Sequence, residues 1–216
     1  MEPLSSREKI LEVAEARFAQ RGYAGVGLRE LASQAGLGKS SLFHHFPSKA
    51  TLYLAVLDRV LLRLEERLRV AWASPGDVAT RLDQSIDALV DGLAEQPTTA
   101  RLLLRALFED DALPAENTPE ARSVDARIAL LVGSLEGLIR EGTEAGAFRA
   151  VSAAHTLQTL IGATVYYFAS GAFGEGVMGE PLFSAEAVRQ RKAEVKNLIR
   201  FGLHRPTQPP LEEDQR

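Results

Sequence analysis

The sequence predicts an all-helical protein, and three features of the chain support this fold class. Apolar residues recur every three or four positions through most of the chain, as they do along the buried face of a helix. No segment shows the alternation of apolar and polar residues that is typical of a strand. Glycine, proline, serine and threonine, which cap or end helices, stand between the periodic runs. We therefore expect about nine helices and no sheet.

The first helix is expected at residues 6–21. Ser5 and Glu8 have the spacing of a capping box, in which a hydroxyl and a carboxylate each bind a free backbone amide at the start of a helix. Gly22 follows the last periodic residue, and glycine readily adopts the left-handed conformation that ends helices. These signals define both ends of the helix.

Two short helices and one long helix follow. The short runs, at residues 28–35 and 39–45, are joined by a tight Gly-Leu-Gly turn. Pro47 has no amide proton with which to continue a helix. The hydroxyl of Ser48 can cap a helix that starts at the next residue. Apolar periodicity then continues over residues 49–73, which predicts a long helix.

Turn signals divide the rest of the chain into five further helices. A Ser-Pro-Gly turn occupies residues 74–76, Thr118 and Pro119 suit the start of a helix, and the Gly-Ala-Phe-Arg segment at 146–149 breaks the pattern. The expected helices span residues 77–95, 98–111, 119–145, 152–170 and 184–204. Residues 205–216 contain three prolines and mixed charges, so we expect a disordered tail there.

Composition excludes several classes of protein. The 216 residues are 45% hydrophobic and 25% charged, which is typical of a globular chain. The absence of cysteine excludes disulfide scaffolds, thiolate zinc sites and cysteine nucleophiles. No apolar stretch approaches the ~20 residues of a membrane span, and the N-terminus has no apolar signal core. We expect a cytoplasmic protein with no cofactor and no metal.

Charge is unevenly distributed along the chain. The net charge is −4, yet residues 1–50 carry seven Lys/Arg and five Asp/Glu, which gives +2 there and −6 for the remainder. A negative average argues against diffuse electrostatic binding to nucleic acid, although it can conceal a local basic region. The asymmetry suggests two regions with different partners.

Residues 28–46, LRELASQAGLGKSSLFHHF, have the features of a helix-turn-helix. Two short helices can cross steeply only where the residues at the crossing are small, as Ala32, Ala35 and Gly36 are. In this motif the second helix enters the DNA major groove, where lysines meet phosphates while serines and histidines influence base preference. The candidate DNA contacts are Arg29, Lys39, Ser40, Ser41, His44, His45 and Lys49.

Residues on both sides of this motif add to the pattern. They are the first helix with Phe18, the Gly-Tyr pair at 22–23, and the Pro-Ser-Lys segment at 47–49 followed by Leu52. With the run at 28–46, they form an ordered set of spacings over about the first quarter of the chain. In this set the chain resembles the TetR-type transcriptional regulators.

The resemblance implies two domains. A three-helix DNA-binding domain would occupy residues 1–48, and a helical domain that dimerises and binds a small molecule would occupy residues 49–204. Three positions depart from the family's usual pattern. Gly27 stands where a serine or threonine often caps the second helix, Phe43 where tyrosine is common, and Ala50 where an acid often follows the lysine. The recognition surface itself is retained.

The C-terminal region supplies candidates for a small-molecule site. Ligand pockets are mostly apolar with a few polar groups. Candidates of both kinds are Trp72, Arg101, Arg105, Phe108, His155, Gln158, Tyr166 and Tyr167. The aromatic residues could equally be ordinary core, and Arg105 could pair with Glu109 one turn later. The expected effector is an apolar or aromatic compound, with an anionic group if the arginines face inward.

The last two long helices provide apolar stripes for a homodimer. The stripes contain Leu157, Ile161, Val165, Phe168, Val188, Val195, Leu198, Ile199 and Leu203. Small residues between them, such as Gly162, allow helices of two copies to approach closely. Because one recognition helix reads few base pairs, we expect a two-fold dimer on an inverted-repeat operator.

Gly174, Gly176 and Gly179 formally spell the nucleotide-binding pattern G-x-G-x-x-G. That pattern needs a strand before it and a helix after it, so that backbone amides converge on a pyrophosphate. Here an expected helix precedes it. We therefore predict a flexible loop between helices at this position and no nucleotide site.

Two other function classes stay open against the leading one. An enzyme built on a helical bundle needs converging catalytic groups, and the sequence offers no such set. A helical protein-interaction module would use the helix-turn-helix for protein contacts, and salt-dependent, sequence-selective DNA binding distinguishes a regulator from both. We predict a ligand-responsive transcriptional repressor, not an enzyme, that binds double-stranded DNA as a homodimer and has no membrane partner.

Overall fold

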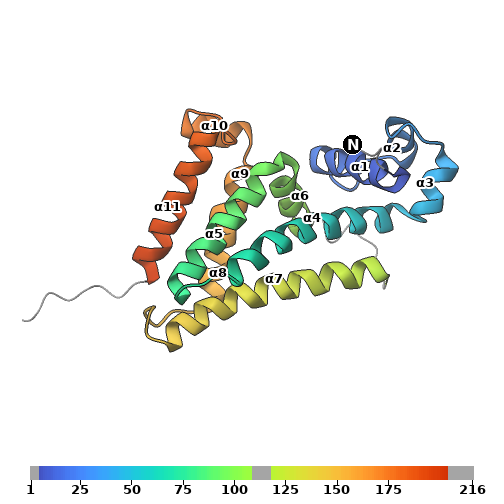
Figure 1. The fold of residues 1–216 in the computed structure, drawn as a ribbon. Helices are drawn as coiled ribbons and strands as arrows, with labels where there is room; N and C mark the ends of the chain where they lie inside the picture. The colour runs from blue at the N-terminus through green and yellow to red at the C-terminus, as the bar shows by residue number, and fades with distance from the viewer. Residues whose placement is uncertain (1–4, 109–117, 204–216) are drawn as a thin grey trace, which may run out of the picture.

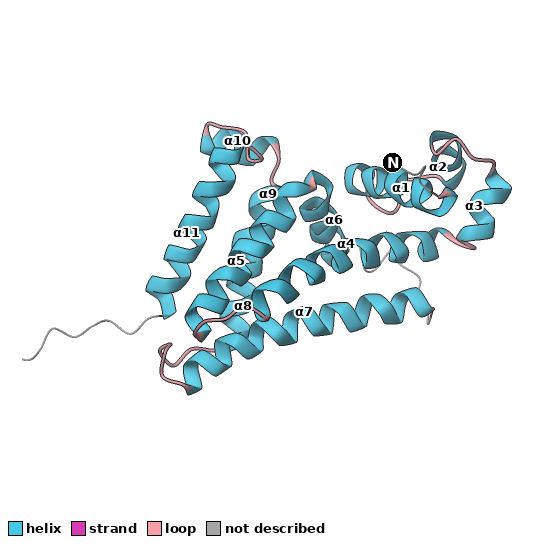
Figure 2. Ribbon diagram, viewed as in Figure 1, coloured by secondary structure: helices cyan, strands magenta, loops and turns pink. Residues whose placement is uncertain are grey.

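The structure, a computed structural model, describes residues 5–108 and 118–203. Every regular element within these ranges is a helix, which confirms the expected fold class (Figure 2). The tail predicted at residues 205–216 lies outside the described residues. None of the described helices combines the length and hydropathy that crossing a lipid bilayer requires.

Three helices form a small domain at one end of the molecule (Figure 1). They are α1 (Ser6–Arg21), α2 (Leu28–Gln34) and α3 (Lys39–His45). Fully buried Phe18, Leu42 and Phe46 fill the space between them. We call this unit the reading head.

Helix α4 (Lys49–Trp72) joins the reading head to the rest of the molecule. Its first turns belong to the core of the reading head, because the ring of Tyr53 meets Phe18 edge-on with centroids 4.9 Å apart. Its later turns pack against α5 and α7. A displacement of α4 would therefore change contacts in both the reading head and the helices that pack on its later turns.

The remaining helices pack into one C-terminal bundle. They are α5 (Val78–Glu95), α6 (Pro97–Phe108), α7 (Pro119–Glu144), α8 (Ala153–Ile161), α9 (Tyr167–Ala169), α10 (Ala172–Met178) and α11 (Ala185–Leu203). A π-helical turn, η2 (Gly162–Tyr166), joins α8 to α9 in one continuous run. Within this turn, the buried Thr164 hydroxyl donates to the Leu160 oxygen of α8 at 2.9 Å.

Helix boundaries agree with the capping signals in the sequence. Ser5 and Glu8 form the complete capping box, and the hydroxyls of Ser48, Thr118 and Ser152 accept hydrogen bonds from amides three residues later. No helix was expected at α10; with α8, η2 and α9 taken as one helix, every other described boundary lies within two residues of its expected position. The end expected for α6 at residue 111 lies outside the described residues.

The expected loop around the three glycines is wrong, because α10 occupies it. Gly174 is buried there, and a Cβ atom on it would lie 2.0 Å from the Ser170 hydroxyl and 2.9 Å from Leu182. The glycine thus serves close packing inside a helix. Gly179, with φ +75°, ends the same helix in the left-handed conformation.

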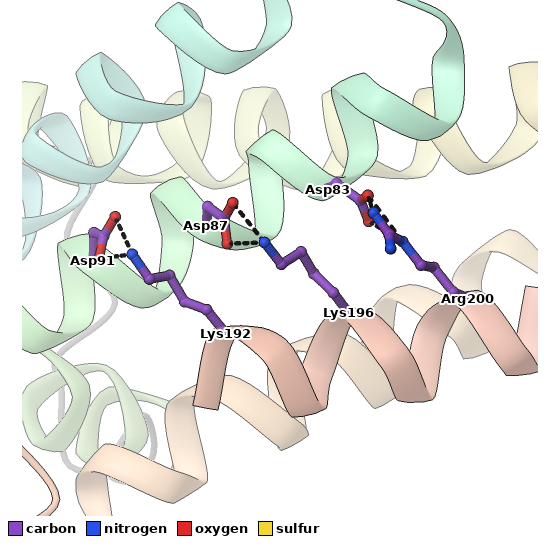
Figure 3. A network of polar contacts seen from close by, with 6 residues as sticks. All are labelled: Asp83, Asp87, Asp91, Lys192, Lys196 and Arg200. Carbon is purple, nitrogen blue, oxygen red and sulfur yellow. Dashed lines mark hydrogen bonds and ion pairs between the residues drawn. The ribbon is translucent and has the colours of Figure 1, made fainter. Parts of the chain in front are cut away.

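A ladder of three ion pairs attaches α11 to α5 (Figure 3). Lys192 donates to Asp91 at 2.9 Å, Lys196 to Asp87 at 2.8 Å, and Arg200 to Asp83. The three acids are spaced four residues apart, as are the three bases, so that the helices meet along one edge of each. Val195, Ile199 and Leu203 bury the neighbouring side of α11 in the core.

Candidate nucleic-acid interface and ligand cavity

The turn between α2 and α3 has the geometry that its small residues predict. Gly36 adopts φ +68°, and the amide of Leu37 donates to the Ala32 oxygen at 2.9 Å, which closes the turn. Gly27 provides no side-chain cap for α2. The hydrophobic sides of both short helices face α1, which leaves the other side of α3 in solvent.

The predicted DNA contacts lie on or beside this solvent-facing side. Arg29, Lys39, Ser40 and His44 are exposed, whereas Ser41 and His45 are partly covered. The rings of His44 and His45 lie edge to face with centroids 5.4 Å apart. Successive helical side chains point about 100° apart, which explains why the second histidine turns toward the protein.

Lys49 is held more closely by the protein than Lys39, whose Nζ lies 5.4 Å from the centre of the exposed Phe43 ring. The Nζ of Lys49 donates to the carbonyl oxygen of Ala24 at 3.3 Å and lies 4.6 Å from the centre of the Tyr23 ring. Partial burial lowers the pKa of this ammonium below its usual value. Lys49 therefore ties the loop after α1 to α4, and its predicted phosphate contact stays a prediction.

A buried polar junction connects the reading head to the bundle. Glu15 of α1 is buried and accepts two hydrogen bonds from Arg63 of α4, at 2.6 and 3.0 Å. It accepts a third from the Thr98 hydroxyl of α6 at 2.9 Å. Three helices thus meet on one carboxylate. Sequence reasoning missed this junction, because its members lie 48 and 83 positions apart in the chain.

Arg105 belongs to the same contact between α6 and α1. Its guanidinium donates to the carbonyl oxygens of Ala19 and Gln20, both at 3.2 Å. A cation at the last carbonyls of a helix satisfies free acceptors and complements the helix dipole. Arg105 therefore caps α1, and its expected ligand role stays a prediction.

An apolar cavity of about 130 Å³ lies within the C-terminal bundle. Every residue that lines it is aliphatic: Leu61, Leu64, Leu68, Leu89, Leu103, Ile128, Leu131, Val132, Leu135, Ile161 and Val165. The walls come from α4, α5, α6, α7, α8 and η2. Such a site can hold an apolar group but offers no side-chain hydrogen bond to it.

The residues predicted for the ligand site do not line this cavity. Arg101, His155, Gln158 and Tyr166 are exposed, and Trp72 is half-buried at the end of α4. The ring of Tyr167 lies under the Arg191 guanidinium at 4.5 Å. The Phe108 side chain lies outside the described residues. The prediction expected aromatic and polar walls, whereas the walls of this cavity are leucine, isoleucine and valine side chains.

The residues predicted for a dimer interface are mostly buried within a single chain. Leu157, Val165, Phe168, Val195, Ile199 and Leu203 are buried in the bundle core. Ile161 and Val165 line the cavity, and Val188 is half-buried. Leu198 alone of the nine is largely exposed. The apolar stripes therefore serve the core first, because a helix in this bundle needs one buried side of its own.

A second polar cluster stands beside the cavity wall. Asp58 accepts from the Ser123 hydroxyl at 2.6 Å and from Arg127 at 2.7 Å, and Arg127 also donates to the buried Glu65. The hydrogen bond to Asp58 raises the pKa of Arg127. These bonds hold α7 to α4 next to Ile128 of the cavity. No group of three or more possible metal ligands occurs in the ranges that the structure describes.

Comparison with known proteins matches both parts of this architecture. Residues 10–56 match "Bacterial regulatory proteins, tetR family", and residues 79–199 match "Tetracyclin repressor-like, C-terminal domain". The chain belongs to the TetR family. The two matched ranges cover most of the reading head and most of the bundle. The second range includes both helices of the ion-pair ladder as far as Lys196.

Individual relatives align with this chain over different lengths. The activator FasR of Mycolicibacterium smegmatis is 36% identical over 105 residues, which cover 49% of this chain and 46% of FasR. The chain thus spans about half the length of FasR. The repressor KstR2 of the same organism is 27% identical over 152 residues, 68% of this chain and 70% of KstR2. These TetR-family relatives include both an activator and a repressor.

A solved structure with bound DNA has the same fold. The structure titled AibR in complex with isovaleryl coenzyme A and operator DNA superposes with a TM-score of 0.72 at 18% identity. The superposition covers 90% of this chain and 97% of AibR. At this identity the likeness establishes the fold.

Proposed function

We propose that this protein is a ligand-responsive transcriptional repressor that binds an inverted-repeat operator as a homodimer. The observation that carries the proposal is the exposed polar side of α3 on the reading head. Lys39, Ser40 and His44 there can reach phosphates and base edges. KstR2, the relative with the longer alignment, is named a repressor.

The cavity supports an aliphatic effector group. Its walls carry no polar side chain, so a polar group placed inside would lose its hydrogen bonds to water. At about 130 Å³ it is smaller than the ~300–1,000 Å³ of pockets that enclose a whole drug-sized ligand. A small acyl chain fits this description, with its polar carrier left outside. The AibR complex names isovaleryl-CoA, which has this composition.

Helix α6 provides the route from effector to DNA. Leu103 lines the cavity, while Thr98 and Arg105 of the same helix bind α1. An acyl group that displaces Leu103 would move these contacts and tilt the reading head. A change in the separation of two reading heads lowers affinity for half-sites one turn of DNA apart. A coupling of about 1 to 3 kcal/mol is typical of such control.

The test begins with selection of bound sequences from a random DNA pool. Isovaleryl-CoA and free CoA are then titrated against the selected complex. We expect isovaleryl-CoA to lower affinity about 5- to 150-fold and free CoA to leave it unchanged. The cavity-filling variant Val165→Phe should lose the response, and the exposed variant Leu130→Phe should retain it. Failure to enrich any sequence would reject a DNA-binding regulator in favour of an interaction module or enzyme.

A further inference from the structure

Arg191 of α11 is a half-buried cation that forms no ion pair with an acid in the described ranges. Its guanidinium donates to the carbonyl oxygen of Ala163 in η2 and lies 4.5 Å from the centre of the Tyr167 ring. The Nε atom is shielded from solvent and has no hydrogen-bond acceptor among the residues that the structure describes. Burial lowers the pKa of Arg191 below its usual value. The fold thus withdraws a positive charge from water without pairing it with a carboxylate.

A pocket of about 210 Å³ lies beside this guanidinium, where α10 connects α9 to α11 (Figure 1). We call it the α10 pocket. Of the described residues around it, Arg191 alone is charged. The large side chains of its other walls are aromatic or apolar, namely Tyr166, Tyr167, Phe173, Val177 and Met178. The pocket therefore combines one cation with surfaces on which a ring can pack.

The α10 pocket is separate from the aliphatic cavity, although one stretch of helix contributes to both. Ile161 and Val165 line the cavity, whereas Gly162, Ala163 and Tyr166 line the pocket. None of the described residues lines both. The stretch contains the π-helical turn, and such turns occur frequently at functional sites. The pocket is therefore a second candidate site with a different chemistry from the first.

Two acids near Arg191 limit the charge of what the pocket can bind. Glu180 and Glu194 line a smaller recess of about 50 Å³, to which Arg191 also contributes. Neither acid pairs with Arg191 or lines the α10 pocket. Their charges oppose the approach of a dianion such as a phosphate ester. A carboxylate brings a single charge and forms strong charge-assisted hydrogen bonds with a guanidinium, so the site favours a monoanion.

We propose that the α10 pocket binds an aromatic monocarboxylate, with the carboxylate on Arg191 and the ring among the aromatic side chains. The Nε donor would gain the acceptor that the described residues do not supply. The pocket is smaller than the ~300–1,000 Å³ that encloses a drug-sized ligand, which suits a compound with one ring. Tyr166 and Tyr167, two ligand residues predicted from the sequence, both line it. The site goes beyond the proposed function and depends on neither the acyl effector nor DNA.

Benzoate is the probe for this site, and two analogues separate charge from ring type. Each compound is titrated calorimetrically into the full chain. Benzamide has the same ring without the charge, and we expect it to bind roughly tenfold or more weakly than benzoate, because its bond to the guanidinium is not charge-assisted. Cyclohexanecarboxylate has the charge without the aromatic ring and should bind about 2- to 10-fold more weakly than benzoate.

Arg191→Met tests the cation while keeping an apolar stem. We expect it to weaken benzoate binding roughly tenfold or more and to remove the preference for benzoate over benzamide. Arg189→Met is the matched control. Arg189 is exposed on the same helix, pairs with Glu186 and does not line the pocket. This control should bind benzoate as the native chain does.

A second pair of variants keeps the test decisive if Arg191→Met fails to fold, since this side chain also holds α11 to η2. Val177 lines the pocket and is 62% exposed, so its replacement leaves the core intact. Val177→Asp adds a negative charge there, and Val177→Asn adds a side chain of the same shape without the charge. We expect Val177→Asp to bind benzoate about fivefold more weakly than Val177→Asn and benzamide equally well.

Several results would overturn the inference. They are no saturable binding of benzoate, equal affinity for benzoate and benzamide, full benzoate affinity in Arg191→Met, or equal benzoate affinity in the two Val177 variants. Equal affinity for cyclohexanecarboxylate and benzoate would reject the aromatic class of ligand. None of these measurements uses DNA or an acyl-CoA. Their failure would leave the proposed regulator standing, and failure of the DNA selection would leave this site standing.

Discussion

At the scale of single residues, two lysines of the reading head have different tasks. Lys39 is exposed, whereas Lys49 is bound to Ala24 and Tyr23. We expect Lys39→Ala to weaken binding to all DNA sequences and to reduce the salt slope of affinity by about one. Lys49→Ala should lower the free energy of unfolding by about 1 kcal/mol, because a cation–π contact and a hydrogen bond are lost. DNA titrations at several salt concentrations and chemical denaturation separate the two effects.

The two histidines should act on base preference. His44 is exposed at the end of α3 and His45 is partly covered beside it. Because side chains of the second helix reach base edges in the major groove, the double variant His44→Ala/His45→Ala should select a different consensus from random DNA. An unchanged consensus with full affinity would place the recognition surface elsewhere.

Asp77 gives a residue-level prediction about pH. Its carboxylate accepts the Thr80 amide at 2.8 Å at the start of α5, which holds the pKa of Asp77 below its usual value. A depressed folded-state pKa stabilises the protein above the unfolded pKa of about 4 and loses this effect as pH falls. The melting temperature of Asp77→Ala should therefore lie below that of the native chain at pH 7. The gap should narrow below about pH 4.

Local residue patterns predicted the reading surface but could not predict the junction or the cavity. Arg29, Lys39 and His44 were predicted from the short-range spacing of the helix-turn-helix, and the structure leaves all three side chains exposed. The Glu15–Arg63 pair depends on how α1 crosses α4, and spacing within one helix carries no information on that crossing. Arg105 was assigned to a ligand site because the sequence carries no information on the packing of α6 against the end of α1.

At the scale of helices, α6 should be the element that couples the two parts. Arg105→Met removes the donors to the end of α1 while keeping an apolar stem, and we expect a loss of about 1.5 kcal/mol in unfolding free energy. It should also weaken the effect of isovaleryl-CoA on operator affinity. Arg101→Met, one turn earlier and exposed, is the matched control and should change neither quantity. Equal behaviour of the two variants would exclude Arg105 from the coupling.

Helix ends were predictable where a side chain caps them. Ser48 and Thr118 identify the starts of α4 and α7 because hydroxyls seek free amides near them in sequence. Helix α10 was not predictable, because glycines in a sequence usually indicate a loop. Only the packed structure shows that Leu182 leaves no space for a side chain at Gly174. The π-helical turn also lacked a signal, because its extra residue depends on packing against α5 and α6.

At the scale of the whole molecule, the charge asymmetry of the sequence is not a property of the described bundle. The reading head contains the slightly basic N-terminal residues, whereas residues 51–108 and 118–203 carry 17 acids and 16 bases and are close to neutral. Most of the excess of acids belongs to residues outside the described ranges. The helical periodicity predicted the order of the helices along the chain. The cavity could be located only from the way these helices pack.

The ion-pair ladder also has a repeat that does not by itself define one register. Asp83, Asp87 and Asp91 are followed by Glu95 at the same spacing. If α11 slid along α5 by one helical turn, about 5.4 Å, three pairs would form again with each base one acid further on. Charge therefore holds the helices together without choosing their alignment. That choice belongs to contacts that do not repeat, above all the Arg191 guanidinium, which donates to the Ala163 carbonyl and covers the Tyr167 ring.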